Sequence, residues 1–436
     1  MRRVAIIGSG ISGLAVAHGL QGQAHVTLFE AGDYFGGHTH TVDVTLDGHT
    51  HGVDTGFLVL NERTYPRLLK LFEQLGVEIA PSDMSFSVQV PDIGLEWSGS
   101  DLSSVFAQRS NLFKPRFWRM LRDILRFNML TTAIASTGSE EQMVQPIADF
   151  LAHHGFSDEF RDWYFLPMIG CIWSCPTDQM LRFPVATLIR FCHNHGLIQV
   201  ANRPQWFTVR GGARQYVQKI VAGVPDARLN SPVRSVKRAP AGSGAAGTWV
   251  ATDRGSERFD EVVFACHSDQ ALALLSDASE AERSVLGAIR YQPNRAVLHT
   301  DRSVLPKREL AWASWNYERA ADGDREQARV CLHYLLNRLQ PLPWQQPVLV
   351  SLNPVREPDA KQVHAEFDYA HPVFDQRAID AQSELPQIQG KAHIWFCGAW
   401  TRYGFHEDGL MSGQNVAQSL IARWKLRDRL MQREAA

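Results

Sequence analysis

Three glycines near the start of the chain have the spacing of a phosphate-binding turn. Gly8, Gly10 and Gly13 form the pattern G-x-G-x-x-G after residues 4–7, an apolar, largely β-branched run. Such a run is typical of a strand buried on both faces, and residues 11–20 read as the helix that follows. The first glycine allows the tight turn, the second lets the backbone approach a pyrophosphate, and the third lets helix and strand pack closely. We therefore predict a dinucleotide site, with the open amides around Ser12 facing the phosphates.

A carboxylate at the end of the next apolar segment completes this pattern. Residues 24–30 end on Glu30, where a carboxylate can accept hydrogen bonds from a ribose. The stretch 242–247 matches G-x-G-x-x-G letter for letter, but it leads into a strand-like segment, residues 248–252. Since no helix begins there to meet a phosphate, we predict a hairpin loop.

The composition narrows the classes of function. The 436 residues are 44% hydrophobic and 21% charged, with a net charge of -2, which gives no general case for nucleic-acid binding. The length suggests two or three domains. The six cysteines lack zinc-ligand spacing, so we expect reduced, packed thiols in a reducing cytoplasm and no metal. The sequence contains no run of about eighteen purely apolar residues, so we expect no membrane-spanning helix.

The segment after Glu30 carries a resemblance to a known family. Glu-Ala at 30–31, a Gly-Gly pair at 36–37 and a following threonine resemble the second half of the FAD motif of flavin-containing amine oxidases. The same motif occurs in protoporphyrinogen oxidases and phytoene desaturases. Those proteins usually carry arginine after the paired glycines, whereas this chain has histidine. The resemblance implies FAD as the cofactor and these contacts: Glu30, Ala31, Gly36, Gly37, His38 and Thr39.

The histidines of this region also have a simpler interpretation. Threonine separates His38 from His40 and His49 from His51. A polar surface or hairpin accounts for these four histidines without any ligand. We favour that interpretation over a metal site, because no carboxylate or cysteine spacing supports one.

Two further segments resemble the same family. Gly56 closes a Gly-Val-Asp-Thr-Gly element that passes near the flavin in the family, and Val233 matches the strand that meets the adenine. Near the end of the chain, the buried strand 392–397 enters a glycine turn, and residues 403–413 lead into a helix. Reduction places negative charge near the flavin N1 and C2 carbonyl, which a helix N-terminus stabilises. The candidates here are Gly398, Asp408, Gly409 and Met411, with the amides of residues 409–411 as the electrostatic site.

The arrangement of these motifs predicts an α/β fold. We expect a Rossmann-like FAD-binding domain formed by residues 1–90, 203–275 and 385–436. A discontinuous, mixed α+β substrate domain would comprise residues 91–202 and 276–384. Only one dinucleotide site is credible, so we expect a flavin reduced by the substrate and reoxidised by oxygen, a quinone or a carrier protein.

The expected reaction is the transfer of a hydride from a substrate C–H bond to the flavin N5, an FAD-dependent oxidoreduction. Trp400, Phe405 and His406 lie next to the flavin motif and would shape the approach of the substrate, with simple packing as the alternative. Either an amine or a lipid substrate is compatible with these residues. A flavin-binding sensor without activity is the non-enzymatic alternative.

The middle of the chain favours the lipid slightly. Residues 111–127 read as a basic amphipathic helix with Pro115 in its first turn, a kind of helix that can lie on an anionic membrane. Residues 146–202 are mostly helical and rich in aromatics, of which Trp173 is the first choice to reach a cavity. Four more aromatics could line the floor of a substrate sheet: Trp312, Trp315, Tyr317 and Tyr334. We expect a cytoplasmic protein, with peripheral contact at the inner membrane as an alternative.

Overall fold

A parallel five-stranded sheet forms the centre of the nucleotide-binding part. The computed structural model describes residues 1–137, 145–173, 176–194, 196, 204–239, 247–320 and 330–434. The strand order is β10-β2-β1-β14-β20, and all pairings are parallel. The strands come from the beginning, middle and end of the chain: β1 (Arg3–Ile7), β2 (His25–Phe29), β10 (Asp226–Arg228), β14 (Glu261–Phe264) and β20 (Ile394–Phe396). The predicted α/β class is confirmed.

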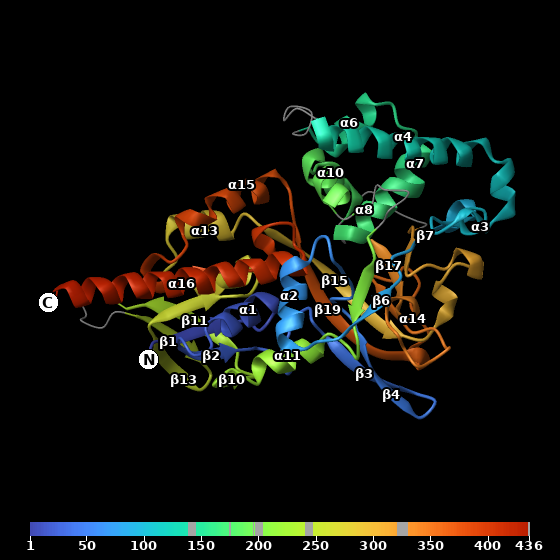
Figure 1. Ribbon diagram of the computed structural model, residues 1–436. Coiled ribbons are helices and arrows are strands. Elements are labelled where there is room, and N and C mark those ends of the chain that lie inside the picture. The colour runs from blue at the N-terminus through green and yellow to red at the C-terminus, as the bar shows by residue number, and fades with distance from the viewer. Residues whose placement is uncertain are drawn as a thin grey trace.

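Alternate residues of β1 enter two different cores. Val4 and Ile6 belong to the cluster that contains α1 (Ile11–Gly19) and α16 (His406–Glu434), which pack on each other. Ala5 and Ile7 face a second cluster on the other side of the sheet. This period of two explains the continuous apolar run of the sequence, because a strand covered on both faces needs no polar residue. Figure 1 shows α16 running beside α1 and this sheet.

The second face is covered by a small antiparallel sheet and two helices. The sheet consists of β11 (Val233–Arg238), β12 (Thr248–Thr252) and β13 (Gly255–Phe259), and the helices are α12 (Ser268–Leu274) and α13 (Glu280–Leu286). β11 and β12 pair in antiparallel fashion, as the predicted hairpin requires. The connecting residues 240–246, which contain most of the second glycine pattern, lie outside the described part of the chain.

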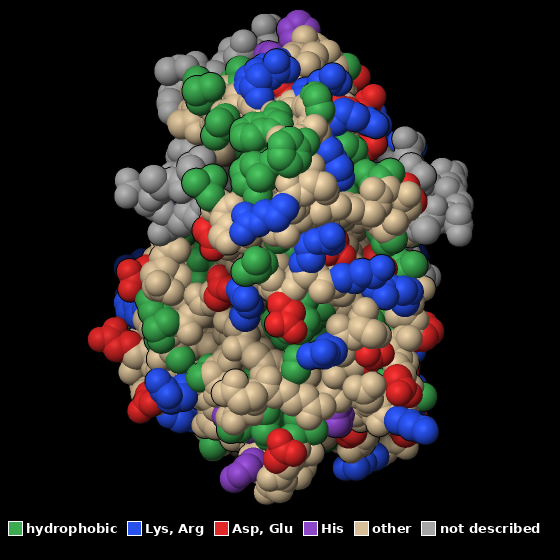
Figure 2. Space-filling view, turned by 90° about the vertical axis from the view of Figure 1, so that its right-hand side faces the viewer, with side chains coloured by type: hydrophobic (Ala, Val, Ile, Leu, Met, Phe, Trp, Pro, Cys, Tyr) green, Lys and Arg blue, Asp and Glu red, His purple; other side chains and the backbone are tan. Residues whose placement is uncertain are grey.

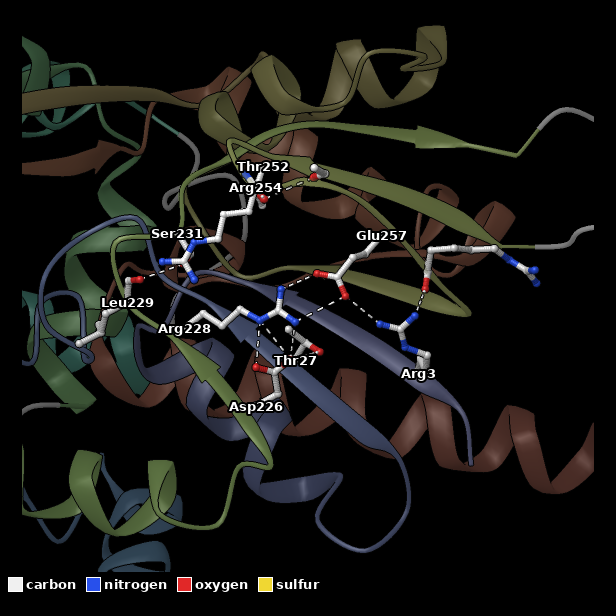
Figure 3. A network of polar contacts seen from close by, with 11 residues as sticks. Arg3, Thr27, Asp226, Arg228, Leu229, Ser231, Thr252, Arg254 and Glu257 are labelled. Atoms are coloured by element: carbon white, nitrogen blue, oxygen red, sulfur yellow. Dashed lines mark hydrogen bonds and ion pairs between the residues drawn. The ribbon is translucent and has the colours of Figure 1, made fainter.

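An ion-pair network fixes the edge of the parallel sheet (Figure 3). Arg228 binds Asp226 on its own strand and Glu257 on β13, and Glu257 also accepts from Arg3 of β1 at 2.9 Å. Thr27 of β2 donates to Asp226 at 3.0 Å. Beyond this edge the backbone amide of Ser231 donates to the carbonyl oxygen of Glu30. The network therefore positions the loop that follows β10 against the end of β2.

The second part of the molecule is built on a seven-stranded sheet in the order β19-β15-β18-β17-β16-β7-β8. β7 was placed by sequence in the FAD-binding part, but it pairs with β16 in this sheet. The division into two domains otherwise stays a prediction. The strands are β7 (Phe86–Val90), β8 (Leu95–Ser98), β15 (Arg290–His299), β16 (Trp315–Glu318), β17 (Cys331–Leu335), β18 (Leu349–Leu352) and β19 (Val363–Val373).

A buried polar network crosses this sheet. The Ser351 hydroxyl lies 2.6 Å from both His299 Nε2 and His333 Nδ1. His333 Nε2 lies 3.0 Å from Glu318, which also accepts from Arg356 Nε at 2.9 Å. Glu318, His333 and Cys331 are close enough to hold a metal ion. Because the carboxylate and imidazole already satisfy each other and the carboxylate carries a guanidinium, we assign the cluster a structural role.

A group of helices forms a third part of the molecule, at the upper right of Figure 1 and away from the parallel sheet. The predicted basic helix is α4, which begins at Pro115 as expected but extends to Thr137. The other helices of this part are α3 (Leu102–Val105), η2 (Arg109–Phe113), α6 (Ile147–His153), α7 (Asp158–Phe160), the π-helical turn η3 (Arg161–Phe165), α8 (Leu166–Trp173), α9 (Thr177–Leu181) and α10 (Val185–Asn194). No described helix has an apolar stretch long enough to cross a bilayer.

Short elements connect these parts. Helix α2 (Pro66–Leu75) ends at Gly76, which has the left-handed conformation with φ of 60°. The remaining elements are β3 (Thr41–Leu46), β4 (His49–Asp54), β5 (Leu60–Asn61), β6 (Ile79–Ser82), β9 (Trp206–Val209), α11 (Arg214–Val221), α14 (Leu336–Leu339) and α15 (Gln376–Glu384). The five described cysteines are free, and four of them are buried, as predicted; Cys175 lies outside the described residues.

Candidate cofactor and substrate site

One cavity of about 920 Å³ joins the two parts of the molecule. Its walls come from the loops at the carboxyl ends of β1, β2 and β14, from β19 and α8, and from the turn before α16. The carboxyl ends of parallel strands are where α/β folds bind nucleotides. The remaining walls lie in the seven-stranded sheet and the helical part, so a single ligand space touches both.

The glycines of the first turn act as the sequence predicts. Gly8 has φ of 102°, and a Cβ there would lie 2.8 Å from the carbonyl oxygen of Ala265. A Cβ on Gly13 would lie 2.0 Å from the carbonyl oxygen of Gly8, so this glycine closes the turn against the helix. A Cβ on Gly10 would meet nothing within 4 Å. Gly10 precedes α1 and supplies no side-chain cap, which leaves this helix end open toward the cavity.

Ser9 links the first turn to the second glycine loop, and sequence reasoning missed it. Its hydroxyl donates to Glu30 Oε2 at 2.5 Å and accepts from the amide of Gly36 at 3.1 Å. The other carboxylate oxygen of Glu30 accepts from the amide of Gly32 at 2.9 Å. Glu30 thus organises both loops, and the spare lone pairs of its carboxylate remain available to a ribose.

The paired glycines pack directly on the first turn. Gly37 has φ of 57°, and a Cβ there would lie 3.1 Å from the Cα of Gly10. Gly36 has φ of 127°, and its Cβ would lie 2.4 Å from the carbonyl oxygen of Thr39. Gly56 completes the layer, because its Cβ would lie 2.2 Å from the carbonyl oxygen of His38. These close approaches need glycine at each position.

His38 is partly buried in the cavity wall, so the polar-surface interpretation is wrong for this residue. Its ring centroid lies 5.3 Å from that of His371 and 5.0 Å from that of Tyr369. Burial, together with the neighbouring His267, lowers the pKa of His38 to about 4. Its Nε2 is buried without a hydrogen-bond partner, a cost that a polar ligand atom would remove. His49, by contrast, lies exposed on the β3–β4 hairpin, as predicted.

The C-terminal glycine turn is fitted around Trp400. A Cβ on Gly398 would lie 2.3 Å from the Trp400 indole nitrogen, which donates to the carbonyl oxygen of Cys266 at 3.2 Å. The Gly398 amide donates to the Ser412 hydroxyl at 3.2 Å. Trp400 is buried in the second core. Its ring forms part of the cavity wall, but packing accounts for most of its contacts.

The electrostatic site predicted at residues 409–411 is displaced by one turn. The amide of Gly409 already donates to the carbonyl oxygen of Phe405 inside α16, so it is not an open amide of the helix end. Asp408 accepts from the Phe405 amide at 3.1 Å, and burial raises the Asp408 pKa to about 6. A Cβ on Gly409 would lie 2.8 Å from Ile11. The role of this glycine is close packing on α1, and Met411 does not line the cavity.

His406 opens α16 and is fixed from two sides. Its Nε2 lies 2.7 Å from the Tyr216 hydroxyl, which also contacts the Thr39 hydroxyl. The ring of Phe57 stacks on the imidazole, with centroids 3.8 Å apart. Burial, together with His38, lowers the His406 pKa to about 3. The imidazole is therefore neutral at pH 7, and it shares one hydrogen bond with the Tyr216 phenol. Neither Tyr216 nor Phe57 carries a sequence pattern that points to this contact.

The far end of the cavity is apolar. Trp173 and Phe191 lie on α8 and α10, and Trp315 and Tyr334 lie on neighbouring strands of the seven-stranded sheet. Trp173 thus reaches the cavity as predicted, whereas Trp312 and Tyr317 do not line it. Phe191 stacks on Phe405 with ring centroids 4.6 Å apart. This part of the cavity is an aromatic chamber next to the start of α16.

Most of the predicted residues share the cavity. Those that line it are Gly8, Gly10, Ser12, Glu30, Ala31, Gly36, Gly37, His38, Gly56, Val233, Gly398, Trp400, Phe405 and His406. The others stand behind the wall: Gly13, Thr39, Asp408, Gly409 and Met411. The open end of α1, the carboxylate of Glu30 and the unpartnered nitrogen of His38 form a set of groups that fits a flavin dinucleotide.

Residues 11–332 match the model of the flavin-containing amine oxidoreductases. The chain belongs to this family. It is an FAD-dependent oxidoreductase, as the sequence predicts. No curated protein sequence matches the chain.

Solved structures share the fold of this flavoprotein at low sequence identity. A CLA-producing fatty acid isomerase from P. acnes is 15% identical, with a TM-score of 0.67 over 96% of this chain and 98% of its own. Cyclohexylamine oxidase from Brevibacterium oxydans IH-35A is 16% identical, with a TM-score of 0.65 over 97% and 99%. Wild-type putrescine oxidase bound to putrescine gives the same values. The shared fold thus spans proteins with chemically different substrates.

Proposed function

We propose that this flavoprotein oxidises an uncharged, lipid-like substrate by removing hydrogen from one of its carbon atoms. The aromatic chamber carries the proposal. Its described lining includes Met84, Ile172, Trp173, Phe191, Trp206 and Trp315. Such a surface favours an apolar chain, because each buried methylene group contributes about 0.8 kcal/mol.

The acidic residues of the cavity support the same choice. Glu30 is engaged by Ser9 and Gly32 at the nucleotide end, and Asp368 is exposed. An alkylammonium ion entering the chamber would therefore lose its hydration without meeting a buried carboxylate among the described lining residues. Aromatic faces alone can hold a cation, so oxidation of an amine is the competing outcome of the test.

The reaction divides between cofactor and protein. When bound, FAD supplies the two-electron acceptor for a hydride from the substrate. The protein contributes the orientation of the substrate C–H bond, through the stacked Phe191 and Phe405, and the exclusion of water from the chamber. The neutral His406, held by Tyr216 and Phe57, keeps the start of α16 in place. We propose oxygen, a quinone or a carrier protein as the acceptor that reoxidises the flavin.

Anaerobic reduction of the bound flavin tests the proposal. Unsaturated long-chain acyl lipids should bleach the flavin absorbance, whereas polyamines and aromatic amines should not. Ile172→Trp would fill the chamber and slow bleaching by about tenfold or more, since overpacking costs about 1–3 kcal/mol. Ile93→Trp is the matched control, because Ile93 is exposed and outside the cavity. If only amines bleach the flavin, the substrate is an amine and the proposal of a lipid-like substrate is wrong.

A further inference from the structure

The helical part carries an exposed surface that is both apolar and basic. We define the α4 surface as the exposed side chains of α3, η2 and α4. Its apolar members are Leu102, Leu112, Phe113, Trp118, Leu125 and Met129. In the face shown in Figure 2, hydrophobic side chains gather at the level of these helices, flanked by lysine and arginine side chains.

Two aromatic side chains stand out on this surface. Phe113 is 86% exposed, the largest value among the described bulky apolar side chains, and Trp118 is 49% exposed. The Trp118 indole nitrogen donates to the carbonyl oxygen of Leu112 at 2.9 Å, and its ring lies 5.3 Å from that of Phe106. Trp118 is therefore held in place at the surface, with little rotamer entropy left to lose on binding.

The charge of this surface is positive because the two acids that pair with the arginines of α4 are buried. Glu159 is 5% exposed and pairs with Arg116 and Arg119, whose side chains are 67% and 52% exposed. Asp123 is 1% exposed and pairs with Arg122 and Arg126. Each buried carboxylate thus anchors two guanidinium groups whose outer sides face solvent. Lys114 and Arg109 add two more cations along the same stretch.

The position of α4 connects this surface to the active site. The inner side of α4 packs against α7 and α10, and α10 carries Phe191 into the aromatic chamber. The α4 surface is thus the outside of the helical layer whose inside forms the chamber wall.

We propose that the α4 surface docks the protein on an anionic phospholipid bilayer. Phe113 and Trp118 would enter the interface between headgroups and acyl chains, while the arginines would bind lipid phosphates. Amphipathic helices with exposed aromatics and cations bind membranes in this way, and each cation near an anionic leaflet adds to the affinity. The proposal concerns binding, so it does not depend on the nature of the oxidised substrate.

Vesicle flotation of the holoenzyme tests the proposal. The wild type should float with phosphatidylcholine vesicles that contain about 30% phosphatidylglycerol, less so as salt is added, and far less with pure phosphatidylcholine. The double variants Phe113→Ser/Trp118→Ser and Arg119→Glu/Arg122→Glu should each lower the bound fraction by about tenfold or more. Thermal unfolding and flavin content confirm that both variants fold.

Matched variants on the far end of α16 serve as controls. Leu426 and Leu430 are 60% and 50% exposed, and Arg427 and Arg429 are exposed beside them. Leu426→Ser/Leu430→Ser and Arg427→Glu/Arg429→Glu should float like the wild type. The proposal is overturned if the wild type fails to float, if it floats equally with both kinds of vesicle, or if the α4 variants float no less than the controls.

Discussion

Removing the hydroxyl of Ser9 should weaken FAD binding. In Ser9→Ala, the amide of Gly36 loses its acceptor and Glu30 loses one donor. A buried donor without a partner costs about 1–3 kcal/mol, and a hydrogen bond to a charged group contributes about 1.5–3 kcal/mol. A total of about 2.5–6 kcal/mol follows, shared between the fold and the loop that carries Gly36 toward the cofactor.

The expected effect is a fall in FAD affinity of about 10- to 100-fold, equal to about 1.4–2.7 kcal/mol. Fluorescence titration of the FAD-free protein measures the affinity, and urea unfolding measures the stability. Ser351→Ala is the matched control, since Ser351 is equally buried and makes two hydrogen bonds of 2.6 Å in the seven-stranded sheet. This variant should lose stability but keep its FAD affinity. Equal FAD affinity in Ser9→Ala and the wild type would refute the reasoning.

Two other perturbations separate the roles of the glycines and histidines. In Gly10→Ala the new Cβ meets no protein atom, so the stability of the FAD-free protein should stay within about 0.5 kcal/mol of the wild type, whereas FAD should bind weakly. In Gly13→Ala the new Cβ overlaps the Gly8 carbonyl, so this variant should not fold. Soluble expression and circular dichroism check both variants. Burial, together with His38, lowers the pKa of His371 to about 3, so the unfolded chain takes up a proton below pH 6.5 that the folded chain refuses. The stability of the FAD-free protein should therefore fall as pH drops from 6.5 toward 3, by up to ~1.4 kcal/mol per pH unit for this residue. Urea unfolding at several pH values should show a shallower fall for His371→Gln than for His49→Gln, and equal slopes would contradict the assignment.

The parts of the site that depend on local geometry could be predicted from sequence. Gly8, Gly10 and Gly13 have their roles because a strand, a turn and a helix follow one another within a few residues, and Glu30 follows at the end of the next strand. A succession of neighbouring elements like this one can be predicted from the spacing of residue types.

Contacts between distant segments could not be predicted in this way. In the sequence, Ser9 is only a small residue between two glycines. Its role depends on the fold, which brings the Gly36 amide within 3.1 Å of the Ser9 hydroxyl. Tyr216 and Phe57 reach His406 only through the tertiary fold. His38 looks like part of an alternating polar stretch, and its partial burial follows from the packing of residues 38–40 against residues 55–57. The sequence also placed the helix N-terminus one turn late, because Gly409 suggested a turn where it serves close packing.

The packing of α16 on α1 has a consequence for biosynthesis. A Cβ on Gly413 would lie 2.2 Å from the carbonyl oxygen of Ser12, so a residue near the end of the chain lies directly against the phosphate-binding turn near its start. A ribosome must therefore synthesise the chain as far as Gly413 before that turn has its final neighbour. The complete FAD site therefore forms late in synthesis. Until then the nascent polypeptide must avoid aggregation without the stabilisation that bound flavin provides.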